Sequence, residues 1–218
     1  MSKKSYNQLA GQKISRIEAI SDGVFAIAMT LLILDVRVPA TANVNSETEL
    51  LKTLTTVALR LLSYLLSFMT LGIFWVGHAT QFKFINKTDR HLTWLSIFFL
   101  MFVSLLPFST AFLSEFINFK LAVGVYWLNL CCLGWTLYLH WKYAKRRDLV
   151  DPDFDLAIID KAITDRIVYA QIFYAVGALI SFINTYASVI FIILVQLNYA
   201  TALFFTPRGK LSTVETEE

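Results

Sequence analysis

An acidic side chain inside a long apolar segment is the first place where this chain could do chemistry. Asp22 lies in the segment from Arg16 to Pro39, which is long enough to cross a bilayer. A carboxylate in or near the hydrocarbon is costly, so an ionisable residue in such a segment marks a functional site by default. His78 is a second candidate, because it ends the run Phe74–His78 in another apolar segment and a buried imidazole needs a hydrogen-bond partner.

These two residues belong to a set of polar side chains that are expected in the same half of the predicted membrane. We expect a hydrogen-bonded network that consists of Arg16, Ser21, Asp22, Trp75 and His78. Such a network either locks two helices together or relays protons. A relay needs further ionisable groups across the membrane, and the later apolar segments contain almost none, so the structural role is favoured. A proton- or ion-coupled secondary transporter that uses Asp22 and His78 is the alternative.

Enzymatic motifs are absent from the sequence. It contains no HExxH, no CxxC and no glycine-rich phosphate loop, and its Ser, His and Asp residues do not have a spacing that indicates a catalytic triad. We therefore predict no catalytic residues, no bound metal and no cofactor. His91 and His140 are expected as polar tips at the membrane–water boundary. Cys131 and Cys132 are adjacent within an apolar segment and are expected to behave as buried apolar residues.

An aliphatic face runs along the first apolar segment. Helical spacing places four residues on it: Gly23, Ile27, Leu31 and Leu34. Such a stripe faces lipid or a protein core, or it lines a pore whose narrow points are hydrophobic rings. Periodicity alone does not choose between these interpretations.

Composition indicates an integral membrane protein. The 218 residues are 56% hydrophobic and 16% charged, against about 25% charged in soluble domains, and the mean hydropathy is +0.59. We predict an all-α polytopic fold with six spans, at 16–38, 51–82, 91–113, 121–143 and two within 167–205 divided at Asn184–Thr185. The transmembrane domain would cover 16–206, between an N-terminus at 1–15 and a tail at 207–218.

Basic residues indicate the orientation. They gather on one side of the predicted membrane, in the N-terminus, around Lys83–Arg90, in 142–166 and at Arg208 and Lys210. The other side holds few. The positive-inside rule therefore places both termini in the cytoplasm, in agreement with an even number of spans.

Three motifs resemble those of one family. Arg16-x-x-x-Ile20-Ser21-Asp22-Gly23 resembles the R-x-x-x-FSDG signature that opens the first helix of the transmembrane protein 175 potassium channels in their bacterial form. The segment Phe74-Trp75-x-x-His78 resembles that family's second-helix motif, and Leu105–Thr110 is similar to its third-helix pattern. Ile20 departs from the family's usual phenylalanine, an apolar residue for an apolar one.

The resemblance implies a homotetramer in the bacterial plasma membrane, with the first helix of each subunit around a K⁺-selective pore. The family has no TVGYG filter, and neither has this sequence. Its narrow isoleucine corresponds to Ile27, with the next hydrophobic layers at Leu31 and Leu34. Thr30 would add a polar layer. The implied partners are K⁺ ions, the bilayer and further copies of the chain, with no nucleic acid.

Overall fold

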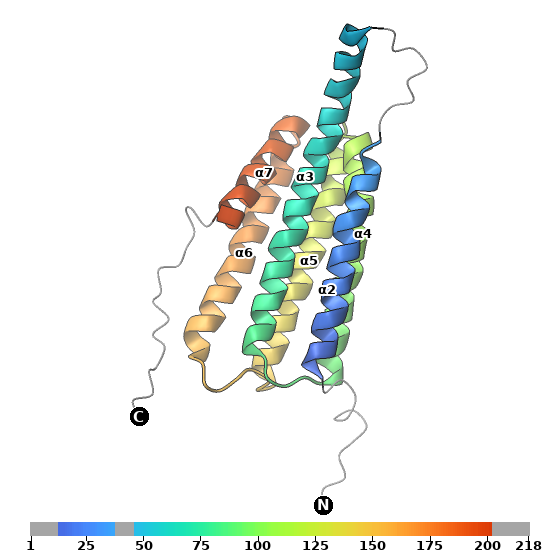
Figure 1. Cartoon of the computed structure of the whole chain (residues 1–218). Helices are drawn as coiled ribbons and strands as arrows, with labels where there is room; N and C mark the ends of the chain where they lie inside the picture. The colour runs from blue at the N-terminus through green and yellow to red at the C-terminus, as the bar shows by residue number, and fades with distance from the viewer. Residues whose placement is uncertain (1–12, 38–45, 202–218) are drawn as a thin grey trace, which may run out of the picture.

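The apolar segments form a bundle of long helices in the computed structural model, which describes residues 13–37 and 46–201 (Figure 1). The described residues form α2 (Ile14–Leu31), the 3₁₀ helix η1 (Leu32–Asp35), α3 (Glu47–Phe84), α4 (Arg90–Glu115), α5 (Lys120–Arg146), α6 (Leu156–Ile180) and α7 (Thr185–Thr201). Five of them, with η1 continuing α2, are long and apolar enough to cross a membrane, and α7 is a shorter apolar helix. The predicted all-α fold is confirmed.

Side-chain caps explain where several helices begin. Ser46 accepts a hydrogen bond from the Glu49 amide at the start of α3, and Asp89 accepts one from Leu92 at the start of α4. Asp155 accepts two amide bonds at the start of α6. The Asn184 side chain accepts a bond from the Ala187 amide, so the predicted division at Asn184–Thr185 coincides with a capped helix start.

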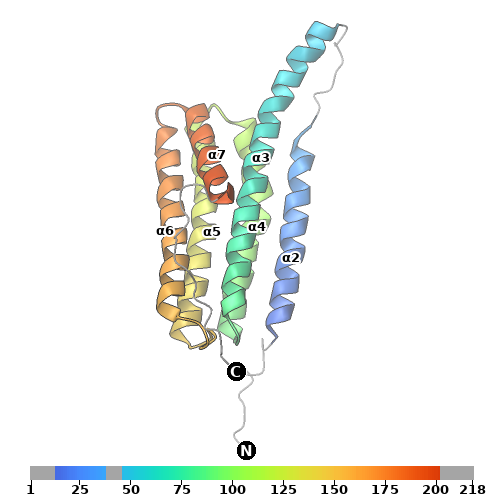
Figure 2. The same cartoon turned by 60° about the vertical axis from the view of Figure 1, so that its left-hand side comes forward.

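Three spans differ clearly from their predicted bounds, and the fifth differs most, because α6 begins at Leu156 rather than at 167. The first is α-helical only to Leu31 and continues to Asp35 as a 3₁₀ helix, whereas a single helix to Val38 was predicted. The second has 38 residues, about 57 Å at 1.5 Å per residue, and it projects beyond its neighbours at one end of the bundle (Figure 2). Residues 1–12 of the predicted N-terminus 1–15, the predicted tail 207–218 and the boundary at 206 lie outside the described residues.

Aromatic packing fixes α2 against α3 and α4. The Phe25 ring of α2 lies 5.9 Å from that of Phe99 on α4, and Phe99 lies 6.3 Å from Phe74 on α3. All three side chains are buried. Burial of a phenylalanine side chain contributes roughly 1.5–3 kcal/mol in water, and inside a bilayer close packing rather than water exclusion supplies the stability.

A chain of buried polar side chains joins four helices in the other half of the bundle. Thr110 on α4 donates to Ser67 on α3 over 2.6 Å, and Ser67 donates to the Tyr126 hydroxyl of α5 over 3.3 Å. Tyr126 and Thr70 share a bond of 2.9 Å, and Gln196 of α7 donates to Thr70. These contacts fix the relative rotation of the helices, since an unpaired polar group in hydrocarbon is costly.

Basic residues gather at one end of the bundle, on the helix ends and in the connections there, and we call it the basic end. It contains the loops 85–89 and 147–155, which pair through an isolated bridge between Ile85 and Val150. Lys145 forms an ion pair of 2.6 Å with Asp160. This end anchors α3, α4, α5 and α6 to one another.

Candidate functional site: the exposed face of α2

The predicted aliphatic face of α2 and η1 is exposed along its whole length. The exposed fraction is 61% for Ile27, 43% for Leu31 and 65% for Leu34. The opposite side of the same segment is packed against the bundle and consists of Ile17, Ser21, Phe25, Ala28 and Leu32. An apolar stripe directed away from the protein core therefore faces either lipid or other copies of the chain.

Gly23 and Thr30 lie on this same exposed side. A Cβ atom built on Gly23 would meet no atom within 4 Å, so nothing in its own chain crowds this position. Among the described residues nothing crowds Gly23, so a close contact at this position can come only from another molecule. The Thr30 hydroxyl donates to the Ile27 carbonyl over 2.8 Å, which leaves its oxygen lone pairs exposed beside Ile27. Thr30 is the residue for which we predicted a polar layer beside the aliphatic face.

The structure joins two residues of the predicted five-residue network. The Trp75 indole donates to Asp22 Oδ1 over 2.8 Å and so links α3 to α2. Asp22 lies five residues before Ile27, which places it about 140° around the helix axis from the aliphatic face. Asp22 is exposed in the single chain. The contact fixes the position of α2 on α3.

The other three residues have separate environments. Ser21 donates to the Ile17 carbonyl of its own helix over 2.7 Å. Arg16 is exposed, and within residues 13–37 and 46–201 no ion pair joins it to Asp22. His78 is 2% exposed and stacks on Phe99 with ring centroids 4.7 Å apart. The predicted network therefore contains more residues than the structure joins. Ser21 and His78 point into the packed interior, whereas Asp22 and Trp75 do not.

A polar pair that the sequence analysis missed lies deep in the bundle. His140 is fully buried, which corrects its predicted place at the membrane–water boundary, and its Nδ1 lies 2.7 Å from Gln81 Oε1. Gln81 Nε2 donates to the Leu137 carbonyl, so Oε1 is an acceptor and His140 Nδ1 carries the proton. Gln81 lies three residues after His78 on the same face of α3, a spacing that points to a shared polar interior.

Within the described part of the chain, no cluster of three or more His, Cys, Asp or Glu side chains is arranged to hold a metal ion. Cys131 and Cys132 are free thiols and are only partly buried. The site is therefore built from aliphatic side chains and one indole–carboxylate contact.

Comparison with known proteins identifies the fold and the family. The profile described as "Endosomal/lysosomal potassium channel TMEM175" matches residues 16–107. A Chamaesiphon minutus protein named as a potassium channel is 34% identical over 178 residues, covering 80% of this chain and 87% of that protein. A chicken protein named as an endosomal/lysosomal proton channel, TMEM175, is 39% identical over 106 residues, 46% of this chain and 21% of that protein.

A solved structure has the same architecture. The crystal structure of a lysosomal potassium-selective channel TMEM175 homologue from Chamaesiphon minutus superposes with a TM-score of 0.73 at 29% identity, covering 86% of this chain and 96% of that one. Fold, motifs and relatives agree, and the chain belongs to the TMEM175 family.

Proposed function

We propose that this chain forms a potassium-selective channel in which four subunits surround a pore lined by α2, with its narrowest ring at Ile27. The observation that carries the proposal is the continuous aliphatic face of α2, exposed in the single chain although the rest of the helix is packed. The names of the Chamaesiphon relatives support K⁺ as the permeating ion.

A ring of isoleucine side chains restricts ions by excluding water. An ion that passes must give up part of its hydration shell without receiving replacement ligands, so the ring acts as a hydrophobic constriction. K⁺ is less strongly hydrated than Na⁺ and loses that part of its shell more cheaply. Leu31 and Leu34 extend the constriction along the axis, and the exposed Thr30 oxygen gives a partly dehydrated ion one point of contact.

The geometry of one chain supports assembly. Within the described residues a single subunit presents the α2 face as an open surface, so a pore along this face requires several copies around an axis. The open space at Gly23 leaves room for that approach, since small residues permit close contact of helices in membranes. In this arrangement the basic end faces the cytoplasm of a bacterial plasma membrane, and both termini lie on that side.

The carrier alternative requires Asp22 and His78 to act together. Asp22 bonds to Trp75 on the exposed side of α3, while His78 packs between the Phe99 and Phe82 rings. Secondary transporters also show internal repeats and broken helices at the midplane, and the described helices α3 to α6 run without interruption. The separation of Asp22 from His78 therefore favours the channel.

Flux from liposomes tests the proposed function. Purified protein reconstituted with K⁺ or Na⁺ gradients is expected to pass K⁺ faster than Na⁺, without dependence on a proton gradient, and to elute as a tetramer in detergent. A monomer, or uptake that stops when the proton gradient is collapsed, would contradict the proposal. Protein-free liposomes provide the baseline.

A further inference from the structure

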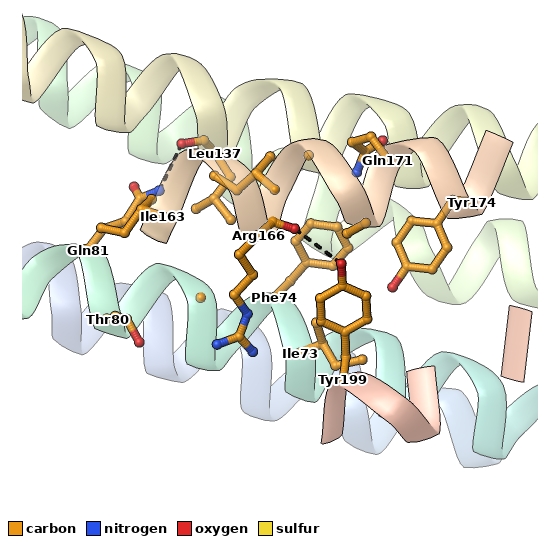
Figure 3. Close-up of a pocket in the computed structure, with 14 residues that line it drawn as sticks. Ile73, Phe74, Thr80, Gln81, Leu137, Ile163, Arg166, Gln171, Tyr174 and Tyr199 are labelled. Atoms are coloured by element: carbon orange, nitrogen blue, oxygen red, sulfur yellow. Dashed lines mark hydrogen bonds between the residues drawn. The ribbon is translucent and has the colours of Figure 1, made fainter. Parts of the chain in front are cut away.

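Two connected hollows lie between the helices on the side of α3 away from the pore face. The inner one is a cavity of about 60 Å³ between α3, α5 and α6 (Figure 3). The outer one is a groove of about 720 Å³ along α2, α3 and the end of α7. Ile73, Arg166 and Tyr199 line both hollows, so the groove leads to the cavity past these three residues.

Arg166 places a positive charge at the junction. Figure 3 shows its guanidinium directed from α6 toward Thr80 and Ile73 of α3. The side chain is exposed, and within the described residues no carboxylate forms an ion pair with it. Asp160, six residues earlier on α6, forms its ion pair with Lys145, and Asp22 on the far wall of the groove accepts a hydrogen bond from Trp75. An exposed guanidinium without a carboxylate partner among the described residues is available to pair with an anion from outside the chain.

The remaining lining is mostly apolar, and most of its polar side chains have partners within the chain. The groove walls carry Phe25, Met29, Phe68, Met69 and Val76. In the cavity Gln171 Oε1 has no hydrogen-bond partner. The Tyr174 hydroxyl is 1% exposed and lies near the side chain of Gln196, whose Oε1 is unpaired as well. A ligand that fits must therefore combine an anion, a long apolar part and groups that pair with a hydroxyl.

The hollows lie beside α3 and α6 on the side toward the basic end, where molecules of the adjacent lipid leaflet can reach them. α7 lies beside only part of α3 and α6, and both views show the two helices uncovered toward the basic end (Figures 1 and 2). Arg166 is the last charged residue of α6, since 167–180 carries no charge, so it marks the level at which the helix enters the hydrocarbon. An arginine there extends its head group toward the phosphates of the adjacent leaflet.

We propose that this junction binds an anionic phospholipid from the leaflet at the basic end. The phosphate pairs with the Arg166 guanidinium, which suits phosphate oxygens bidentately. One acyl chain lies in the groove along Ile73 and Met69, and the ester or glycerol oxygens reach the cavity and the Tyr174 hydroxyl. The site is separate from the aliphatic face of α2 and does not depend on which ion the protein conducts.

Lipid binding to the full-length purified protein tests the site. In native mass spectrometry with dioleoyl phosphatidylglycerol, Arg166→Gln is expected to weaken binding about fivefold, the effect of removing one basic residue near a membrane surface. Arg166→Lys should retain most of the affinity. Lys161→Gln is the matched control, because Lys161 is an exposed cation on the same helix that lines neither hollow.

Two further arms identify the ligand. Ala170→Phe adds bulk to the cavity without changing charge, and it should weaken phosphatidylglycerol binding as well. Dioleoyl phosphatidylcholine should bind more weakly than phosphatidylglycerol, and inorganic phosphate should not compete at equal concentration. Equal binding by the Arg166→Gln and Lys161→Gln proteins, no preference for the anionic lipid, or displacement by phosphate alone would overturn the proposal.

Discussion

Ile27→Asn is expected to bring the K⁺/Na⁺ flux ratio close to one and to raise total flux. An asparagine amide at each position of the narrow ring holds water, so both ions pass with more of their hydration shells and the difference in dehydration cost is lost. Ile27 is 61% exposed in the single chain, so the substitution leaves the packed side of α2 intact and folding should be unaffected. The measurement is the ratio of K⁺ to Na⁺ flux from liposomes.

An isoleucine on another helix provides the matched control. Ile172 on α6 is 52% exposed and lies away from the α2 face, so Ile172→Asn makes the same chemical change outside the pore. It should leave the flux ratio at the unmodified value. An Ile27→Asn tetramer with unchanged selectivity would remove Ile27 from the constriction.

Asp22→Ala is expected to lower stability more than it changes selectivity. The substitution removes the acceptor of the Trp75 indole and with it the direct side-chain bond between α2 and α3. For a partly exposed bond to a carboxylate we expect a loss of about 1 kcal/mol, or roughly 2–4 °C in thermal unfolding for a chain of this size. This is less than the roughly 3–5 kcal/mol for breaking a buried ion pair, because Asp22 is exposed in the single chain.

A double-mutant cycle isolates the contact. Trp75→Phe should cost a similar amount, and the Asp22→Ala/Trp75→Phe protein should be no less stable than either single variant. Melting of the detergent-solubilised tetramer measures all three. If the Asp22→Ala protein melts normally but loses pH-coupled uptake, Asp22 has a transport role and the result favours a carrier over a channel.

The helices could be predicted from the sequence because hydropathy and capping act locally. The division before Thr185 coincides with an Asn184 cap, and the alternation of apolar blocks with charged loops located most other helix ends to within a few residues. The exception is the start of α6, which lies at Leu156 rather than at 167 because its first turns are polar. The change to a 3₁₀ helix after Leu31 had no comparable signal. Helix propensities summed over a few residues do not distinguish the last turn of an α-helix from a 3₁₀ turn.

The candidate site could be predicted only in part because side-chain partners depend on how helices rotate against one another. The exposure of Ile27, Leu31 and Leu34 agrees with the face that spacing predicted. The burial of His140 was not predicted. The Gln81 amide that hydrogen-bonds its imidazole belongs to another helix and lies 59 residues away in the sequence. Sequence distance from the end of an apolar run indicates membrane depth, but it carries no information on such a partner.

The central claim is that the α2 face lines the pore, and a thiol at position 27 tests it most directly. In a background with Cys131→Ser and Cys132→Ser, Ile27→Cys should make K⁺ flux sensitive to a water-soluble thiol reagent added to assembled channels, while Ile172→Cys should not. Block of the Ile27→Cys channel at a rate that rises with its K⁺ flux is the result we predict. Flux through the Ile27→Cys channel that persists under the reagent, or equal block of the Ile172→Cys channel, would contradict the pore assignment.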